Sequence, residues 1–258
     1  MTVNLHTHTP RCNHAEGSER EYIEAALAAG IKTLGFSDHS PMPFQTDHTS
    51  TFRMKLSEVD DYFSALVALR EEYKDRIHLL IGVEAEYYPG VFPHLQALLK
   101  NYPLDYLIMG QHFLHDEEGY PGCGAKSIDP KWLGLYVDQV IEGLETGAFT
   151  YLAHPDLLHY IGCVSTYKKH YTRLCERCKE LDIPLEINLL GLKEGRHYPN
   201  NHFWQIAGEV GNKVVIGVDA HQPYRFAEAD VLAKALALVE KFHLNLTEDI
   251  PLRNPIVL

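Results

Sequence analysis

The chain has 258 residues and a formal net charge of −12 at pH 7, from 35 acidic and 23 basic side chains. This balance disfavours a surface that follows the phosphates of DNA or RNA, so nucleic acid is not an expected partner. No apolar run approaches the ~20 residues of a membrane span, and no basic, apolar leader precedes the first predicted strand. We therefore expect a soluble, cytoplasmic protein with no membrane partner.

The five cysteines are an odd set in a chain of this length, which favours reduced thiols over a disulfide framework. Cys175 and Cys178 form a CxxC motif inside a predicted helix, and no second pair completes four zinc ligands. We interpret both as ordinary helix residues. The unusual feature of the composition is its 16 histidines.

Short apolar runs bounded by turn residues predict seven strands. In chain order they are Val3–His8, Lys32–Ser37, His78–Glu84, Tyr106–Gln111, Thr150–His154, Leu185–Leu189 and Lys213–Val218. Most are nearly continuous apolar segments such as "LLIGV" and "VVIGV". Such segments are typical of parallel strands that are covered on both faces.

Helical patterns alternate with these strands. They cover Glu19–Ala29, Ser57–Tyr73, Phe92–Lys100, Lys131–Thr146, Tyr167–Leu181, His202–Gly211 and Ala227–Phe242. Ser18 with Glu21, and Ser57 with Asp60, have the spacing of capping boxes. The alternation predicts an α/β fold, a TIM-like barrel with one strand fewer than the usual eight, formed as a single domain over residues 1–258.

The longest connection outside these elements is Ser40–Leu56, which follows the second predicted strand. Its length suits a lid over a site better than a tight turn. Neither GxGxxG nor GxxxxGKS/T occurs in the sequence. Any phosphate chemistry must therefore use groups other than a glycine-rich loop.

Six of the seven predicted strands end in side chains that can bind a metal. These side chains are His6, His8, His39, Glu84, His112, His154, Asp219 and His221. The carboxyl ends of the strands of a parallel barrel lie on one face, where active sites of this architecture form. Residues two apart on a strand point the same way, and barrel closure places the first strand beside the last. The HxH and DxH pairs should therefore be neighbours.

Each of these residues also has an ordinary interpretation when it is taken alone. His112 would more often be a hydrogen-bonded buried histidine, and "AHPD" could be a turn in which Asp156 caps a helix. Glu84 is harder to explain, because a carboxylate at the end of an apolar strand needs pairing, coordination or neutralisation. Taken together, the strand ends favour a metal site. The histidines outside this pattern are expected to be structural and include His48, His78, His94, His115, His170 and His243.

With these motifs the chain resembles the PHP (polymerase and histidinol phosphatase) superfamily, and within it the monofunctional histidinol-phosphate phosphatases. The resemblance is carried by "LHTHTPRCNHAEGS", "GFSDHSPMP", "GVEAEYYPG", "GQHFLHD", "LAHPDLLHY", "EINLLGL" and "GVDAH", in the order that the family shows. It implies a distorted (β/α)7 barrel with three divalent metals at the carboxyl face of the strands. The ligand types suit Zn, Fe or Mn.

The resemblance also implies how the metals are shared. His6, His8, Glu84 and Asp219 would hold one metal, Glu84 would bridge to a second held by His112 and His154, and His14, His39 and His221 would hold the third. Asp38 points away from His39 on its strand and is a candidate for orienting a ligand.

Such a centre suits a phosphate monoester. Three divalent ions outweigh the two carboxylates among the ligands, so the site should attract an anion. A hydroxide shared by two metals can form near neutral pH and would attack phosphorus in line, without a covalent enzyme intermediate. The residues expected to act in catalysis are Asp219, His221, Glu84 and Arg196.

Several residues are candidates for contact with the substrate. Arg196, in the loop after the sixth strand, is expected to clamp phosphate oxygens in two-pronged fashion, and the family carries an arginine in a similar stretch. A solvated arginine is the alternative. Arg53 is the next candidate for a phosphate contact. The ammonium and imidazole of histidinol could be contacted through charge or stacking by Glu86, Asp116, Phe44 or Trp204, and the sequence does not choose among them.

The resemblance therefore implies hydrolysis of L-histidinol phosphate, a small-molecule phosphate monoester, to L-histidinol and phosphate in histidine biosynthesis. One alternative is a PHP phosphoesterase that acts on nucleotides or nucleic-acid ends, which the charge of −12 disfavours. Another is a non-catalytic metal-binding PHP module, which the complete ligand set disfavours. The sequence indicates no oligomeric state.

Overall fold

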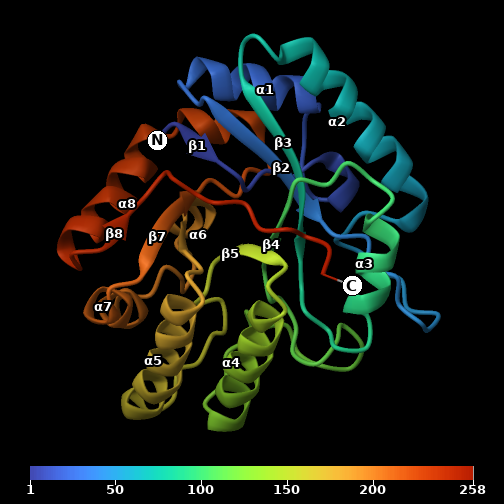
Figure 1. Ribbon diagram of the computed structural model, residues 1–258. Helices are drawn as coiled ribbons and strands as arrows, with labels where there is room; N and C mark the ends of the chain where they lie inside the picture. The colour runs from blue at the N-terminus through green and yellow to red at the C-terminus, as the bar shows by residue number, and fades with distance from the viewer. Residues whose placement is uncertain (258) are drawn as a thin grey trace.

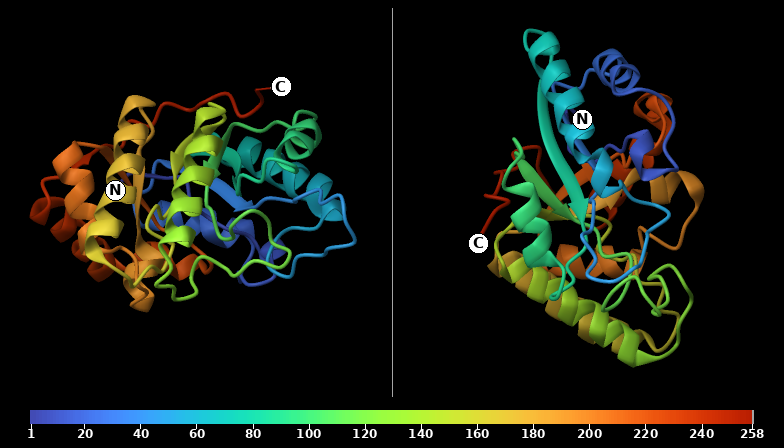
Figure 2. Two further views of the ribbon diagram at one scale, coloured as in Figure 1. Left: turned by 90° about the horizontal axis from the view of Figure 1, so that it is seen from below. Right: turned by 90° about the vertical axis from the view of Figure 1, so that its right-hand side faces the viewer.

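The computed structural model describes residues 1–257, so Leu258, the last residue of the predicted domain, lies outside the described residues. Eight parallel strands follow one another in the sheet in chain order, from β1 to β8. The sheet curls into a half-barrel with helices around its outer side (Figure 1, Figure 2). The predicted α/β, TIM-like architecture is confirmed.

The strands are short, and all their pairings are parallel. They are β1 (Val3–Asn4), β2 (Thr33–His39), β3 (His78–Ala85), β4 (Tyr106–Met109), β5 (Phe149–Leu152), β6 (Leu185–Asn188), β7 (Lys213–Gly217) and β8 (Asn245–Leu246). The seven predicted strands match β1 to β7 in place and order, but the number of strands is eight.

The helices lie between consecutive strands, as predicted. They are α1 (Glu19–Ala28), α2 (Val59–Tyr73), α3 (Phe92–Leu99), α4 (Pro130–Glu145), α5 (Val164–Glu180), α6 (Leu189–Glu194), α7 (Asn201–Val210) and α8 (Ala229–Lys241). Three short 3₁₀ helices complete the set: η1 (Pro10–Cys12), η2 (Leu56–Glu58) and η3 (Pro223–Ala227).

Besides the 3₁₀ helices, one strand and one α-helix are not predicted by the sequence pattern. Strand β8 has only two residues, too few for a recognisable apolar run, and it pairs with the first residues of β7. Helix α6 follows β6 directly, within an apolar stretch whose pattern predicts a continuing strand. The Asn188 side chain accepts the backbone N–H of Gly191 at 2.9 Å, and this cap ends the strand and begins the helix.

The two predicted capping boxes have different outcomes. At α1 the box forms, because Ser18 Oγ accepts the backbone N–H of Glu21 while the Glu21 carboxylate accepts that of Ser18 at 2.7 Å. The predicted capping box at Ser57 and Asp60 does not form. The turn η2 precedes α2 and moves the helix start to Val59, so Asp60 lies in the first turn and accepts the Tyr102 hydroxyl.

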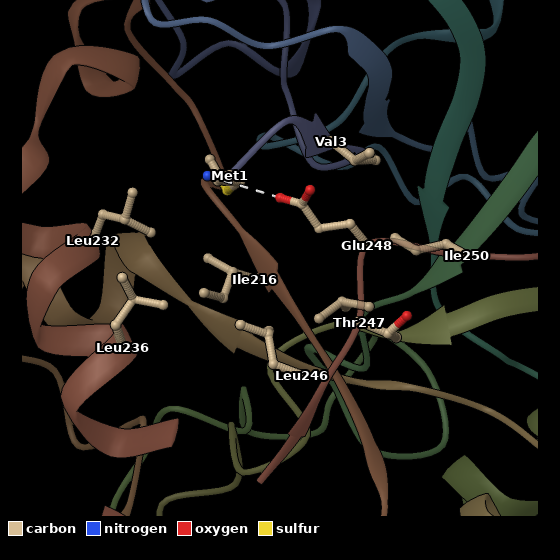
Figure 3. A pocket seen from close by; sticks show the side chains of 10 residues that line it. Met1, Val3, Ile216, Leu232, Leu236, Leu246, Thr247, Glu248 and Ile250 are labelled. Atoms are coloured by element: carbon tan, nitrogen blue, oxygen red, sulfur yellow. Dashed lines mark ion pairs between the residues drawn. The ribbon is translucent and has the colours of Figure 1, made fainter. Parts of the chain in front are cut away.

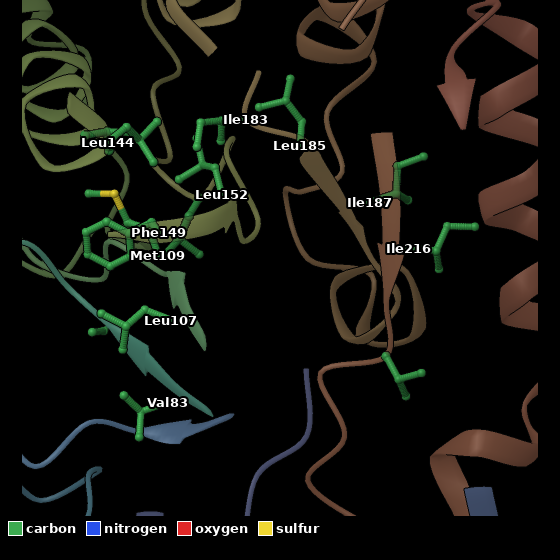
Figure 4. Packing of buried hydrophobic residues seen from close by; sticks show 14 of the residues in the cluster. Val83, Leu107, Met109, Leu144, Phe149, Leu152, Ile183, Leu185, Ile187 and Ile216 are labelled. Carbon is green, nitrogen blue, oxygen red and sulfur yellow. The ribbon is translucent and has the colours of Figure 1, made fainter. Parts of the chain in front are cut away.

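The main core is the apolar layer between the sheet and the helices. Figure 4 shows part of this layer, in which side chains of β3 to β7 pack with Leu144 of α4 and with Ile183. Cys175 and Cys178 are buried in the same layer on α5, which fits their interpretation as ordinary helix residues. No helix among residues 1–257 combines the length and the apolarity needed to cross a membrane.

The inside of the half-barrel has a smaller apolar cluster. It comprises Leu5, Leu80, Tyr106, Ile108, Tyr151, Ala153 and Val215. The chain beyond β8 passes along the amino ends of the strands, where Ile250 packs on this cluster and the Arg253 N–H contacts Thr150 Oγ1 at 3.3 Å. The amino end of the half-barrel is thus covered by the chain itself, which leaves the carboxyl end for a site.

An apolar cavity of about 560 Å³ lies between β7, β8 and α8 (Figure 3). Leu232, Leu236 and Leu246 point into it. Its carboxylate, Glu248, is 3.8 Å from the amino group of Met1 and accepts the Thr2 N–H at 2.6 Å. Because that carboxylate is already paired, the cavity offers little to a polar ligand.

Candidate metal centre

The ends of the first and seventh strands meet, as predicted. Beyond β1 and β7, Thr7 and Ala220 form an isolated parallel bridge. The His8 N–H donates to the Ala220 carbonyl at 3.0 Å, and the Ala220 N–H donates to the His6 carbonyl at 3.2 Å. The barrel thus closes at the level of the HxH and DxH motifs, which brings His6 and His8 beside Asp219.

Glu84 lies in the middle of the histidines. Its Oε1 atom is 2.9 Å from His154 Nε2 and 3.6 Å from His112 Nε2. Its Oε2 atom is 3.0 Å from His39 Nδ1 and 3.5 Å from His6 Nε2. The two oxygens therefore face two different groups of imidazoles, which is the arrangement that a bridging carboxylate needs.

Asp219 completes one of these groups. Its Oδ1 atom is 3.1 Å from His8 Nε2 and 3.5 Å from His6 Nε2. Its Oδ2 atom accepts the side-chain amide of Asn188 at 3.0 Å. The amide fixes the carboxylate so that Oδ1 points at the two imidazoles.

The remaining predicted ligands form a third group at the solvent edge of the site. His14 is exposed, and its Nε2 atom lies 2.9 Å from Nε2 of His221. His14, His39 and His221 each offer a nitrogen within 4.8 Å of the other two. The structure thus brings together all nine residues predicted as ligands.

Several buried donor atoms of this cluster are left without hydrogen bonds. The buried atoms that find no hydrogen-bond partner among residues 1–257 include His6 Nε2, His8 Nε2, His39 Nδ1, Glu84 Oε2 and Asp219 Oδ1. Buried polar atoms are nearly always paired, so a group of unpaired ones that face each other indicates a missing partner. Imidazole and carboxylate donors suit divalent transition metals, and the residues fit such ions.

The charges of the cluster agree with this interpretation. Burial would raise the pKa of Glu84, but the imidazoles, with His112 foremost, hold it well below its usual range. Burial would lower the pKa of His6, yet Glu186 and the two central carboxylates raise it to about 10. The carboxylates are therefore ionised, and the position between them favours a positive charge.

Several ligand candidates are held by partners behind them. His6 Nδ1 lies 2.7 Å from Glu186 Oε1, and Glu186 Oε2 accepts the backbone N–H of His154 at 3.1 Å. His8 Nδ1 is 3.4 Å from Asp38, the residue predicted to orient a ligand. Carboxylates that hold the far nitrogen of an imidazole fix its tautomer and direct the other nitrogen to a metal.

Glu186 and Asn188 are functional candidates that the sequence reasoning does not find. Both are buried on β6, within the apolar stretch "PLEINLLG". Glu186, like Glu84, is a carboxylate on an apolar strand and therefore needs a partner. This feature of the sequence could have identified it.

The backbone is unusual at two of the ligand candidates. His154 has a φ of 34° and Asp219 a φ of 52°, both in the left-handed region that side chains other than glycine seldom adopt. Each of the two residues comes just after its strand has ended, where the chain must turn a side chain into the barrel. Such conformations gather at functional sites.

A cavity of about 700 Å³ opens from this cluster to solvent. Its lining includes seven of the nine ligand candidates together with Phe52, Leu157, Leu190, Glu194, Arg196, Tyr198 and Gln222. The guanidinium of Arg196 contacts Glu194 at 2.7 Å and the Tyr198 hydroxyl at 2.6 Å. Arg196, predicted as a phosphate clamp, thus lines the same cavity as the ligand candidates.

Arg53 and Glu86, the other two predicted substrate contacts, have a different setting. Neither is among the described residues that line the cavity. Their side chains are 2% and 1% exposed and form a two-pronged ion pair at 2.8 and 3.0 Å. A buried arginine that is already paired is poorly placed to grip a substrate entering through the cavity.

Comparison with known proteins shows the family of this chain. The model of the PHP domain matches residues 4–189. A Deinococcus radiodurans protein named "Probable histidinol-phosphatase" is 33% identical over 235 residues, which cover 87% of this chain and 89% of the relative. The Bacillus subtilis histidinol-phosphatase is 24% identical, over 84% of this chain and 92% of its own.

A solved structure gives a further likeness. The histidinol phosphate phosphatase of Lactococcus lactis, solved with zinc, L-histidinol and phosphate, has a TM-score of 0.74 to this chain. It shares 17% sequence identity and covers 95% of both chains. At this identity the likeness shows the fold. On the family match and the Deinococcus relative, the chain belongs to the PHP domain family.

Proposed function

We propose that this protein is a metal-dependent phosphatase that hydrolyses L-histidinol phosphate to L-histidinol and phosphate. The observation that carries the proposal is the cluster of unpaired imidazole and carboxylate atoms at the base of a cavity with Arg196 at its mouth. The names of the Deinococcus and Bacillus relatives support the substrate. A biosynthetic enzyme of this kind is expected in the cytoplasm.

The proposed centre holds three divalent ions. His6, His8, Glu84 and Asp219 would hold the first, Glu84, His112 and His154 the second, and His14, His39 and His221 the third. The Lactococcus structure was solved with zinc, and the donor types suit iron and manganese as well. When bound, such ions supply Lewis acidity and a nucleophilic hydroxide near neutral pH.

The residues around the centre would bind the substrate and stabilise the charge of the transition state. Arg196 would grip the phosphate oxygens and neutralise charge that grows in the transition state. Glu84 and Asp219 stay ionised in the cluster and hold it together through His6 and its neighbours. Phe52 and Tyr198 line the cavity that the substrate would enter.

The experiment that tests the proposal compares kcat/KM for histidinol phosphate, a nucleoside monophosphate and an aryl phosphate on the zinc-loaded protein. We expect histidinol phosphate to lead by about 100-fold or more, because a site built for polar groups discriminates strongly. A preference for the nucleotide would favour the nucleotide phosphoesterase. No turnover of any substrate by fully loaded protein would favour the non-catalytic module.

A further inference from the structure

We propose that Arg53 is a positioning residue that fixes the His112 imidazole through Glu86. This gives a role to the connection Ser40–Leu56, which carries Arg53 from the end of β2 to the carboxyl ends of β3 and β4. The inference rests on the metal centre of the proposed function. Arg53 and Glu86, which the sequence predicts as substrate contacts, would instead support the metal ligand His112.

The contacts link Arg53 to Glu86, and Glu86 to His112. Arg53 Nη1 donates to Glu86 Oε2 at 2.8 Å, and Nη2 donates to Oε1 at 3.0 Å. The same Oε1 lies 2.7 Å from His112 Nδ1. A carboxylate at Nδ1 holds the proton there, so the lone pair at Nε2 is directed to the centre, where Glu84 lies 3.6 Å away.

The ion pair is buried, which makes its effect strong. The side chains of Arg53 and Glu86 are 2% and 1% exposed. Glu86 accepts both prongs of the guanidinium, which fixes its carboxylate in contact with His112. Without the guanidinium, Glu86 would be a buried carboxylate without its ion-pair partner, free to turn away from His112.

Arg53 is also fixed from a second side. Its Nε donates to Glu117 Oε2 at 2.9 Å, and Nη2 lies 2.8 Å from the same oxygen. All three guanidinium nitrogens thus contact carboxylates of the protein. This arrangement joins the connection Ser40–Leu56 to the segment after β4, and it leaves the guanidinium committed to the support of His112.

The consequence for metal binding can be measured directly. Zinc-binding isotherms in chelator-buffered Zn²⁺ are compared for wild type, Arg53→Met, Arg53→Lys and Glu86→Gln. We expect one binding step of Arg53→Met to move to higher free zinc by about 10- to 100-fold, as found when partners behind metal ligands are removed, with the other steps unchanged. Arg53→Lys should recover part of the shift, because it restores the charge without the two-pronged geometry.

Two controls make the result specific. Arg70→Met removes an arginine that pairs with Asp105 at 2.9 Å at the opposite end of the barrel, and its isotherm should superimpose on wild type. In a His112→Ala background the affected step is already lost, so Arg53→Met should cause no further shift. If Arg53→Met does not fold, Glu86→Gln, which preserves the side-chain shape, decides.

The outcomes separate the possible failures. An Arg53→Met isotherm identical to wild type, with weaker inhibition by inorganic phosphate, would mean that Arg53 binds phosphate and would overturn the inference. An equal shift in the presence and absence of His112 would overturn it as well, because the effect would then not pass through that imidazole. Wild-type protein that binds one zinc ion or none would instead refute the proposed centre itself.

Discussion

Glu84 presents one oxygen to His154 and the other to His39, and this makes it the residue on which the proposed centre depends most. Glu84→Gln preserves the shape and removes the charge. We expect loss of bound metal and at least about a 100-fold fall in kcat/KM, since loss of a direct ligand should exceed the 10- to 100-fold effect of losing a partner behind one. Metal analysis and steady-state kinetics measure both.

The matched control for Glu84→Gln is His94→Gln. His94 is exposed on α3, outside the cluster, and its substitution should change neither metal content nor rate. His48, another histidine expected to be structural, is a poorer control because its Nε2 lies 3.3 Å from Glu117, a partner of Arg53. Similar losses in Glu84→Gln and His94→Gln would mean that the site is misassigned.

Arg196 separates phosphate binding from metal binding. Its side chain is 41% exposed and lines the cavity, and it is not one of the ligand candidates. Arg196→Ala should leave the metal content unchanged and lower kcat/KM by about 30- to 1000-fold, comparable to removing one donor to a developing charge. Arg196→Lys should recover only part, because a point charge lacks the two-pronged geometry.

The result that would contradict this role is an Arg196→Ala enzyme as fast as wild type with its metals in place. Arg196 would then be a solvated arginine held by Glu194 and Tyr198. Arg225, which contacts Gln222 of the cavity lining at 2.9 Å, would be the next arginine to replace.

The sequence predicts ligand candidates better than it predicts their partners. Strand ends can be located from apolar runs, and those ends placed His6, His112 and the others on one face. The role of Arg53 could not be read in this way, because it depends on how a long connection folds back onto Glu86. Loop contacts of this kind arise only from the tertiary structure.

Among the elements, β6 and β7 show how glycine makes room for the centre. A Cβ added at Gly217 would lie 1.8 Å from Glu186 Oε1, and one added at Gly110 would lie 1.8 Å from Glu84 Oε1. Each glycine therefore leaves the space that a buried carboxylate fills. The centre therefore needs both the buried carboxylate on one strand and the glycine on or just after the neighbouring strand.

Gly217→Ala should displace Glu186 and release Nδ1 of His6. We expect metal affinity to fall by about 10- to 100-fold, with a loss of about 1–3 kcal/mol in the free energy of unfolding from overpacking. Gly90→Ala is the control, because an added Cβ there meets nothing within 4 Å. Chelator-buffered titration and denaturant unfolding measure the two effects. Unchanged zinc affinity in Gly217→Ala would show that Glu186 does not support His6.

The elements themselves were largely predictable, because strands and helices have distinct periods and the alternation fixes their order. The misses occur where the pattern is short or continuous. Strand β8 is two residues long, and α6 continues an apolar run without a break. The Asn188 cap that divides β6 from α6 is a local hydrogen bond, and an asparagine within an apolar stretch does not by itself announce it.

For the whole molecule, closure and function coincide. The strands form an open half-barrel, and the segments that follow β1 and β7 are bridged at Thr7 and Ala220, between the candidate ligands. Ions held by His8 and Asp219 would therefore link the beginning and the end of the barrel. The centre should stabilise the fold as well as perform chemistry.

Metal removal should accordingly lower the melting temperature. A ligand at 100 times its Kd adds about 2.7 kcal/mol to the free energy of unfolding, and three such ions would add about 8 kcal/mol. Near 250 residues, each kcal/mol corresponds to about 2–4 °C, so chelation should lower Tm by about 15–30 °C. Calorimetry before and after chelation, with elemental analysis of each sample, measures the shift and the number of ions.

The loaded sample should contain about three ions per chain, and refilling the chelated protein with Zn²⁺ should restore both Tm and activity. Arg70→Met, altered at the opposite end of the barrel, should show the same chelation-induced shift as wild type although its starting Tm is lower. One ion or none in fully loaded protein would contradict the three-metal centre. The prediction would also be contradicted if all ions were removed and Tm did not change. The contact between Thr7 and Ala220 would then hold without metal, with protonated imidazoles such as His6 balancing the buried carboxylates.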